Sequence, residues 1–158
     1  MVVERLFLSP ARGETQRECR QLELLAGQGV LGDRHFAKES WAGQQLTLVE
    51  AEEIERFCAH TGRPDDLSLT RRNVVTRGIR LNQLVGRQFR LGACLLVGVE
   101  TCEPCRTLGR RLANETLSAP EVVKYWLGRG GLRANVLISG HVACGDTLTL
   151  IEAGEGAP

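Results

Sequence analysis

The chain has no uninterrupted apolar run long enough to cross a lipid bilayer, which argues against a membrane protein. Its first residues also lack a basic segment followed by a long apolar stretch, the pattern of a secretory signal. A strong excess of positive charge is missing as well, because the formal net charge is only +1. We therefore expect a cytoplasmic protein that binds neither membranes nor nucleic acid.

The remaining composition is that of an ordinary globular domain. Hydrophobic residues make up 42% of the sequence and charged residues 25%, a balance that argues against a disordered chain. A length of 158 residues fits one domain with a substantial core. We predict a single domain over residues 1–152 and a flexible tail over residues 153–158, because the tail consists of small and polar residues.

Lysine is nearly absent. Only Lys38 and Lys124 are lysines, and every other basic side chain is an arginine. A GC-rich genome accounts for most of this bias, since it favours arginine codons. The placement of the arginines is more informative, because guanidinium groups bind phosphate and carboxylate through paired hydrogen bonds that ammonium groups cannot copy.

The cysteines form neither a disulfide framework nor a zinc pattern. Six cysteines in a chain without a secretory signal are expected to be reduced thiols. Cys102 and Cys105 form a C-x-x-C pair, but no second cysteine or histidine pair completes a zinc site, so we expect no zinc. The pair also lies too late in a β-rich chain for a thioredoxin-like centre, although a reversible Cys102–Cys105 disulfide stays open. We expect Cys58, Cys94 and Cys144 to be buried among apolar residues.

Short β-rich runs separated by glycines make up most of the chain. The predicted strands cover residues 2–8, 22–25, 44–49, 74–75, 88–91, 94–99, 134–138 and 147–151. Two helices are expected, over residues 50–61 and 119–127, the second with the capping-box residues Ser118 and Glu121. This pattern predicts a mainly β (α+β) fold, a closed or nearly closed barrel with a few peripheral helices, and argues against a doubly wound parallel sheet.

Residues 99–108 carry the strongest chemical signal. Cys105 lies where a strand ends and a short helical turn is expected to begin, so unpaired backbone N–H groups should face its thiol. Arg106, Arg110 and Arg111 follow and would favour the thiolate further. A thiolate can attack a sulfur atom, carry a persulfide or bind a soft metal. Two ordinary cysteines in a turn are the simpler alternative, but that alternative does not account for the adjacent arginines.

A glycine-bounded loop presents Asp33, Arg34 and His35 together. Asp33 could orient either neighbour by hydrogen bonding, which would make a site for an anionic or polar ligand. A surface loop capped by Asp33 is the simpler alternative.

Four arginines fall within residues 71–80, around Asn73 and a predicted strand. Strand alternation puts Arg71 and Asn73 on one face and Arg72 on the other. The segment is either a solvated basic face or a cradle for phosphate or a pterin phosphate, to which Arg77 would also contribute. Later in the chain, Gly130 and Gly131 would let the backbone approach a ligand beside Arg133, although turn formation alone could explain those glycines.

Taken together and in their order along the chain, these segments resemble the MOSC domain, the family named for the C-terminal domain of molybdenum cofactor sulfurase. The resemblance covers most of the chain. Its landmarks are Gly32-Asp33-Arg34-His35, Arg72 to Ile79, Leu84-Val85-Gly86, Phe89 to Gly92, Pro104-Cys105 with Leu108, and Gly130-Gly131-Leu132 leading into Gly140 to Asp146. No single landmark is specific, but the ordered set is.

The resemblance implies a strand-rich barrel of the kind also seen in pyruvate kinase. It implies that Cys105, which follows Pro104, is the reactive cysteine. In sulfurase-like members this cysteine is proposed to carry sulfur as a persulfide, which a pyridoxal-phosphate desulfurase supplies and a metal centre receives. In amidoxime-reductase-like members the same cysteine binds molybdenum, and the pterin cofactor sits against basic residues.

Three functions follow from this resemblance. The first is a sulfur carrier that is loaded by a separate pyridoxal-phosphate cysteine desulfurase and delivers to a molybdoenzyme or its molybdenum cofactor. The second is a reductase of N-hydroxylated compounds that uses the molybdenum cofactor (molybdopterin) and a separate electron-transfer protein. The third is a module that binds or stores the cofactor without catalysis.

The expected site residues follow from the sequence motifs and from the same resemblance. Cys105 is expected to be the nucleophile or the molybdenum ligand. The expected cofactor-binding residues are Asp33, Arg34, His35, Arg71, Asn73, Arg77, Arg106 and Arg133.

Overall fold

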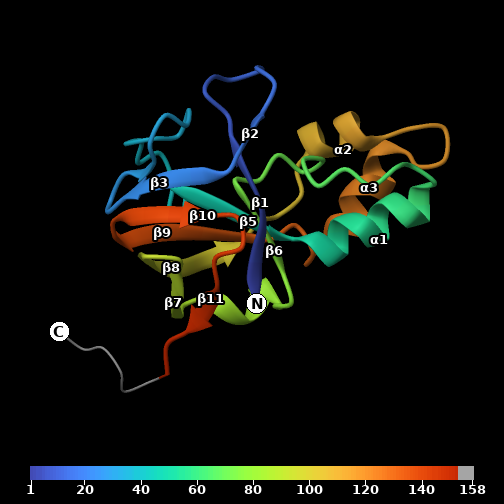
Figure 1. The fold of residues 1–158 in the computed structure, drawn as a ribbon. Coiled ribbons are helices and arrows are strands. Elements are labelled where there is room, and N and C mark those ends of the chain that lie inside the picture. Colours follow the sequence, from blue (N-terminus) through green and yellow to red (C-terminus); the bar gives the residue numbers. More distant parts are fainter. Residues whose placement is uncertain (153–158) are drawn as a thin grey trace.

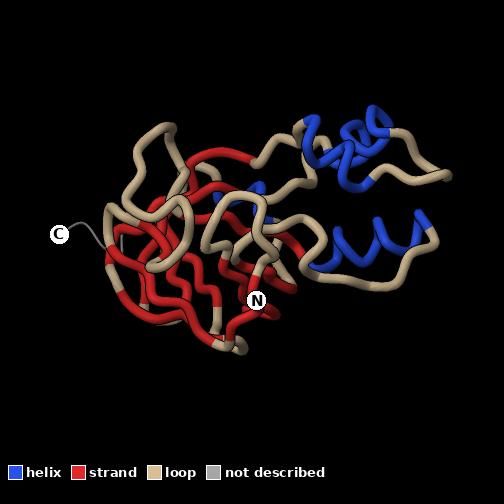
Figure 2. Tube along the Cα trace, turned by 90° about the horizontal axis from the view of Figure 1, so that it is seen from above, coloured by secondary structure: helices blue, strands red, loops and turns tan. Residues whose placement is uncertain are grey.

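The computed structural model describes residues 1–152, so the expected tail over residues 153–158 lies outside the described residues. The strands are β1 (Val2–Leu8), β2 (Arg17–Cys19), β3 (Gln21–Leu25), β4 (Gly29–Val30), β5 (Leu46–Glu50), β6 (Val74–Arg77), β7 (Gln88–Leu91), β8 (Cys94–Thr101), β9 (Leu132–Ile138), β10 (Gly140–Ala143) and β11 (Leu148–Leu150). The helices are α1 (Ala51–Thr61), α2 (Arg106–Leu112) and α3 (Ala119–Trp126), with a short 3₁₀ helix, η1, at Leu81–Leu84. The fold is therefore α+β and strand-rich, with the strands at one end and the helices at the other (Figures 1 and 2).

Eight of the strands form one sheet in the order β11-β7-β8-β9-β5-β6-β1-β2, and the other three form a small sheet in the order β10-β3-β4. Strands β5 and β6 run parallel, whereas β9 pairs with β5 and β1 pairs with β6 in the antiparallel sense. An isolated bridge joins Val2 to Thr147, so β1 approaches the edge strand β11 near the N-terminus (Figure 1). Because continuous pairing closes no sheet within residues 1–152, the expected barrel is not confirmed, whereas the strand-rich α+β class is.

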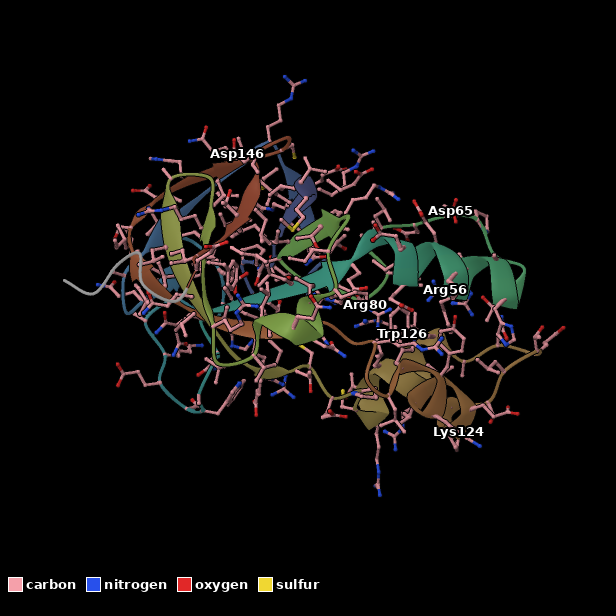
Figure 3. The ribbon with its side chains drawn as sticks, turned by 90° about the horizontal axis from the view of Figure 1, so that it is seen from below. Arg56, Asp65, Arg80, Lys124, Trp126 and Asp146 are labelled. Carbon is pink, nitrogen blue, oxygen red and sulfur yellow. The ribbon has the colours of Figure 1, made fainter. Side chains whose placement is uncertain are left out.

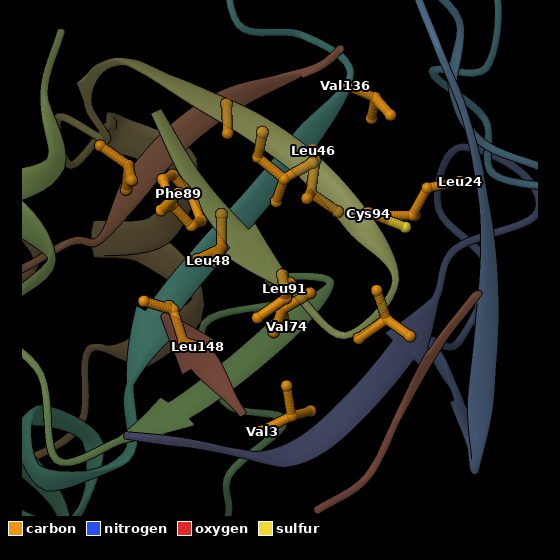
Figure 4. Close-up of a cluster of buried hydrophobic side chains, with 14 of the residues drawn as sticks. Val3, Leu24, Leu46, Leu48, Val74, Phe89, Leu91, Cys94, Val136 and Leu148 are labelled. Carbon is orange, nitrogen blue, oxygen red and sulfur yellow. The ribbon is translucent and has the colours of Figure 1, made fainter. Parts of the chain in front are cut away.

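Two strands at the centre of the large sheet are buried on both faces. In β5 and β6, Leu48 and Val74 point into the core between the strands (Figure 4), whereas Val49 and Val75 point into a second core beneath the helices. Successive strand residues face opposite sides, so each of these strands contributes to both cores. This double burial fixes the position of the chain just before β6, where the site residues lie.

Helices α1 and α3 form where the sequence predicted them, and α2 forms where only a short helical turn was expected. Helix α1 ends at Gly62, whose φ of 65° is left-handed, and α3 begins with the capping box of Ser118 and Glu121. Trp126 of α3 is fully buried and its ring lies 5.2 Å from that of Phe57 of α1 (Figure 3). None of the helices within residues 1–152 is long and apolar enough to span a membrane.

Some local predictions were incomplete or wrong. Strands β2, β4 and β10 were not predicted, because they are short and carry few of the residues that favour strands. Cys58 and Cys94 are buried as expected, but Cys144 is exposed because it lies in the turn that follows β10.

Candidate thiolate and anion-binding site

Asp33 organises the centre of the site. The side chain is 9% exposed, and its Oδ2 accepts hydrogen bonds from the backbone N–H of Ser9 (3.0 Å) and from Nδ2 of Asn73 (3.1 Å). Its Oδ1 accepts from the backbone N–H of His35 at 3.1 Å. One carboxylate thus joins the end of β1, the 32–36 loop and the entry to β6, and its lone pairs are used by the protein itself.

Asn73 forms a second junction immediately before β6. Its Oδ1 accepts hydrogen bonds from the backbone N–H and the hydroxyl of Thr47, at 3.2 and 3.1 Å. Its Nδ2 donates to the carbonyl of Phe7 at 3.3 Å as well as to Asp33. An amide is suited to this position because it donates and accepts at once.

These residues line a cavity of about 230 Å³, here called the arginine cavity. Its walls are Ser9, Asp33, Arg34, His35, Trp41, Gln44, Thr47, Arg71, Arg72, Asn73 and Arg133. A wider, more open cavity of about 860 Å³ adjoins it and shares Asp33, Arg34, His35 and Trp41. The structure therefore brings together six of the expected site residues from segments distant in sequence: Asp33, Arg34, His35, Arg71, Asn73 and Arg133.

Most of the arginines of the arginine cavity have no carboxylate partner within residues 1–152. No carboxylate within residues 1–152 lies within 4.0 Å of the guanidinium of Arg34, Arg71 or Arg72. Arg133 is less free, because its Nε lies 3.5 Å from Glu100. Burial and then the charges of Arg71 and Arg72 lower the pKa of Arg111, so this guanidinium belongs to the same mutually repelling group. An anion bound here would relieve that repulsion.

The backbone holds two of these arginines in place. Arg71 has a left-handed φ of 58°, which is unfavourable for a residue with a Cβ, and its Nη2 donates to the carbonyl of Glu14 at 2.7 Å. Arg72 donates from Nε to the carbonyl of Gly130 at 3.2 Å. Both side chains keep further N–H groups for a ligand, since a guanidinium has five. Unfavourable backbone geometry at such a position is typical of functional sites.

His35 is a half-buried, neutral imidazole on the cavity wall. Nε of Arg34 donates to its Nε2 at 3.2 Å, and Nε2 of Gln44 lies 3.0 Å from its Nδ1. Burial and then the charge of Arg34 lower the pKa of His35, which favours the uncharged ring. The edge of Trp41 packs on this ring at a centroid distance of 5.7 Å.

Cys105 is the exposed N-cap residue of α2. Burial alone would raise the pKa of its thiol. The backbone N–H groups of Leu108 and Thr107, the Thr107 hydroxyl and the charge of Arg72 outweigh that effect and lower the pKa. The sulfur makes no capping hydrogen bond of standard geometry, so the donors act as nearby dipoles at the open helix end. Cys105 is therefore an accessible thiol that ionises more readily than an ordinary cysteine. Arg72, whose charge contributes to this effect, also lines the arginine cavity.

Cys102 differs from Cys105 both in its exposure and in the direction of its pKa shift. It is 1% exposed, and burial raises the pKa of its thiol. A buried, protonated thiol is a poor partner for thiol exchange. The Cys102–Cys105 disulfide considered above is therefore not favoured by this conformation.

Two expected site residues lie elsewhere. Arg77 pairs with Glu4 at 3.2 Å and with Glu55 at 2.5 Å, so its charge is neutralised on the helix side of the sheet. Arg106 is exposed and is not among the residues that line the arginine cavity or the wider cavity beside it. The arginine that most lowers the pKa of Cys105 is Arg72, and not Arg106, Arg110 or Arg111, which the sequence suggested.

Other wall residues were missed or misplaced by sequence reasoning. Arg72 was predicted to face away from Arg71 and Asn73, but all three line one cavity because β6 begins only at Val74 and strand alternation does not apply before it. Trp41 and Gln44 were not singled out. The only available signal was their proximity in sequence to the 33–35 loop.

The part of the chain that the structure describes contains no group of three or more His, Cys, Asp or Glu side chains placed to hold a metal ion. A metal bound at this site would thus receive most of its ligands from a cofactor or from substrate, with Cys105 as the protein ligand.

Comparisons with known proteins agree with this architecture. Among solved structures, the YUAD protein from Bacillus subtilis superposes with a TM-score of 0.79 at 23% identity, covering 93% of both chains. YiiM from Escherichia coli gives a TM-score of 0.68 at 19% identity, covering 97% of this chain and 71% of that one. YiiM from Geobacillus stearothermophilus gives 0.68 at 16% identity, covering 98% and 76%. At these identities the likeness concerns the fold alone. None of the curated proteins compared with the chain matches it.

A match to a family model identifies the family, which the structural similarities alone do not. The model of the MOSC domain matches residues 31–149, a span that includes the Asp33 loop, the arginines before β6 and Cys105. The match covers well over half of the sequence and agrees with the order of the landmarks noted above. This chain belongs to the MOSC domain family.

Proposed function

We propose that this protein is a sulfur carrier in which Cys105 accepts sulfur as a persulfide and passes it to an acceptor held by the arginine cavity. The observation that carries the proposal is an exposed thiol whose pKa is lowered in part by the charge of Arg72, which lines the arginine cavity. Within residues 1–152, no carboxylate pairs with Arg34, Arg71 or Arg72 of that cavity. A thiolate is the nucleophilic form of cysteine, and exposure gives it access to a partner protein.

The loading step uses only this thiolate and a donor persulfide. The Cys105 thiolate attacks the outer sulfur of the donor, the donor's S–S bond breaks, and the donor cysteine leaves as a thiolate. One S–S bond replaces another, so no external oxidant or reductant is needed. A separate pyridoxal-phosphate cysteine desulfurase is the proposed donor, with both partners in the cytoplasm.

The proposed acceptor is a molybdoenzyme or its molybdenum cofactor. Its phosphate matches the cavity, because Arg34, Arg71 and Arg72 lack carboxylate partners within residues 1–152 and guanidinium groups bind phosphate in pairs of hydrogen bonds. When bound, the cofactor supplies a metal centre that can take up sulfur. Asp33 and Asn73 would hold the cavity walls in place through their hydrogen bonds and would leave the guanidinium groups available to the ligand.

Transfer of labelled sulfur tests this proposal. The protein is incubated with a cysteine desulfurase and ³⁵S-cysteine, and the label on the chain is mapped by peptide mass spectrometry without reduction. Label is expected on Cys105 and is expected to disappear in Cys105→Ser. Cys144→Ser is the matched control, because Cys144 is the other exposed cysteine of the described residues, and it should keep the label. Equal labelling of the two variants would refute the assignment.

A second candidate is a reductase of N-hydroxylated compounds in which Cys105 binds molybdenum. An anion cavity whose wall residues Asp33 and Asn73 are hydrogen-bonded to each other favours it, since such a cavity could retain a resident cofactor. Electrons would come from a separate electron-transfer protein. Molybdenum and pterin in freshly purified protein, both lost in Cys105→Ala, would support this candidate. Retention of both in Cys105→Ser without activity would instead indicate a storage module.

A further inference from the structure

A second cavity with arginine walls adjoins the arginine cavity. It has a volume of about 340 Å³ and is here called the α2 cavity, because Arg111 and Leu112 of α2 line it. The chain between α1 and β6 contributes Arg63 and Arg71 to the same walls. Within residues 1–152, Arg71 alone lines both cavities, so the two lie next to each other but consist of different side chains.

Each arginine of the α2 cavity is anchored to a backbone carbonyl. Nη2 of Arg63 donates to the carbonyl of Leu112 at 2.7 Å, and Nη2 of Arg111 donates to the carbonyl of Leu69 at 3.1 Å. Arg71 is held in the same way, by a hydrogen bond of 2.7 Å to a backbone carbonyl. Because a guanidinium has five N–H groups, each of these side chains is held in position and still keeps donors for a ligand.

The walls of the α2 cavity carry more positive than negative charge. No carboxylate within residues 1–152 lies within 4.0 Å of the guanidinium nitrogens of Arg63, Arg71 or Arg111. Asp66, the one carboxylate that the described part of the chain contributes to these walls, instead accepts hydrogen bonds at Oδ1 from the N–H and the hydroxyl of Ser68. Three guanidinium groups against one carboxylate leave two positive charges. Burial and then the charges of neighbouring arginines lower the pKa of Arg111, a repulsion that a bound anion would relieve.

We infer that the α2 cavity is a second anion site of this protein and that it binds a phosphate group. A phosphate monoester carries a charge of about −1.5 to −2 at neutral pH, which matches the excess charge of the walls. Guanidinium groups bind phosphate oxygens through paired hydrogen bonds. The volume of about 340 Å³ is near the lower end of the range of about 300 to 1,000 Å³ typical of small-molecule sites, so the ligand is small. Cys105 does not line this cavity, and the inference holds whether or not Cys105 carries sulfur.

Polar groups on the walls favour a phosphate monoester over free phosphate. The hydroxyl of Thr15, an exposed wall residue, and Oδ2 of Asp66 have no hydrogen-bond partner within residues 1–152. A hydroxyl group on the organic part of a monoester can donate to the carboxylate oxygen and accept from the threonine. Free phosphate has no such organic part, so we expect the monoester to bind more tightly.

Nuclear magnetic resonance of the ¹⁵N-labelled full chain tests the inference. Glycerol 3-phosphate and, separately, inorganic phosphate are titrated at constant ionic strength, with potassium chloride as the control for ion effects. Saturable shifts are expected at the amides of Ser68, Leu69 and Leu112, which line the α2 cavity and not the arginine cavity. Shifts confined to Thr47 and Asn73 would place phosphate in the arginine cavity alone and would overturn the inference, as would equal shifts with chloride.

Arginine variants locate the bound phosphate. Arg63→Gln and Arg111→Gln should each weaken binding at the amides of the α2 cavity by about tenfold or more, the effect expected for losing a charge-assisted hydrogen bond. Glutamine keeps a donor for the backbone carbonyl, and a dispersed spectrum shows that each variant is folded. Arg90→Gln is the matched control, because Arg90 is an exposed arginine of β7 that lines neither cavity, and it should bind as wild type does.

The two probes also identify the source of the phosphate group. Tighter binding of glycerol 3-phosphate than of inorganic phosphate identifies a monoester as the ligand, whereas equal binding identifies free phosphate, and either result supports the site. Equal affinity of Arg63→Gln, Arg111→Gln and Arg90→Gln for both probes would show that phosphate does not use the α2 cavity and would overturn the inference.

Discussion

The ionisation of Cys105 reflects opposing local influences. Burial disfavours the thiolate, whereas the N–H groups of Leu108 and Thr107 and the charge of Arg72 favour it, and the net effect is a lowered pKa. The position of the thiol at a helix start is a property of the sequence around it. The contribution of Arg72 is a property of the fold.

The pH dependence of alkylation measures this balance. In a Cys144→Ser background, the rate of reaction with iodoacetamide should rise with pH about a midpoint below that of an ordinary thiol, because only the thiolate reacts. Arg72→Gln removes a charge that lowers the pKa, so its midpoint should move to higher pH. An unchanged midpoint in Arg72→Gln would contradict the link between the thiol and the cavity.

Arg71 combines a charge that has no carboxylate partner within residues 1–152 with an unfavourable backbone conformation. Its φ of 58° costs a residue with a Cβ about 1 to 2 kcal/mol, whereas glycine adopts it without strain. Arg71→Gly should therefore leave the melting temperature unchanged or higher, although the hydrogen bond to Glu14 is lost. Sulfate binding, followed by calorimetry, should weaken in the same variant. A clear fall in melting temperature would show that the side chain, not the strain, dominates.

Among the secondary-structure elements, the start of β9 supports the cysteine loop. The backbone N–H of Cys102 donates to the carbonyl of Gly131 at 2.8 Å, and the carbonyl of Gly130 accepts from Arg72. Gly131 has a φ of 100°, and a Cβ there would collide with the carbonyl oxygen of Leu48. The glycine pair thus lets β9, β5 and the cysteine loop meet closely.

Gly131→Ala should destabilise the protein by at least about 2 kcal/mol, because it adds a backbone clash to an unfavourable φ. Urea denaturation measures the loss. Gly128→Ala is the matched control: its φ of 71° is also left-handed, but a Cβ there would have no neighbour within 4 Å, so only a cost of about 1 kcal/mol is expected. Equal losses in the two variants would show that the close approach to Leu48 is not important.

For the whole molecule, the contact between the sheet and the helices includes a buried carboxyl group. Glu50, at the junction of β5 and α1, is 6% exposed and accepts a hydrogen bond from the backbone N–H of Leu81 at 2.9 Å. Burial raises the pKa of Glu50, and that hydrogen bond only partly offsets the effect.

Glu50 therefore makes global stability depend on pH in a defined direction. Its pKa in the folded state is above the unfolded value near 4.5, so the unfolded chain loses the proton first as pH rises. The free energy of unfolding should fall as pH rises from the unfolded pKa through the folded one, and then level off. Glu50→Gln should equal wild type in acid and be more stable at neutral pH, as measured by urea denaturation. A difference that shrinks as pH rises would contradict this sign.

Much of the fold could be predicted from local patterns. The two longer helices follow from their apolar faces and end signals, and most strands from β-rich runs between glycines. The position of Cys105 at a strand-to-helix junction also follows from its immediate neighbours. The expected barrel is not confirmed, because closure needs a continuous ladder between β1 and β11. Within residues 1–152 an isolated bridge and a few neighbouring backbone hydrogen bonds join them instead.

The sequence by itself determined the family, through the order of its landmarks along the chain. It also determined the position of Cys105 at the start of a helix and the loop that contains Asp33, because each of these is specified by residues close together in the chain. Only the tertiary structure decided which arginines line the cavity. Arg77 finds Glu4 and Glu55, whereas Arg71 and Arg72 find no carboxylate within residues 1–152 and face the cavity instead. The physical reason is that a side chain's electrostatic partners are set by distance in space, and these partners lie on strands and helices far apart in the sequence.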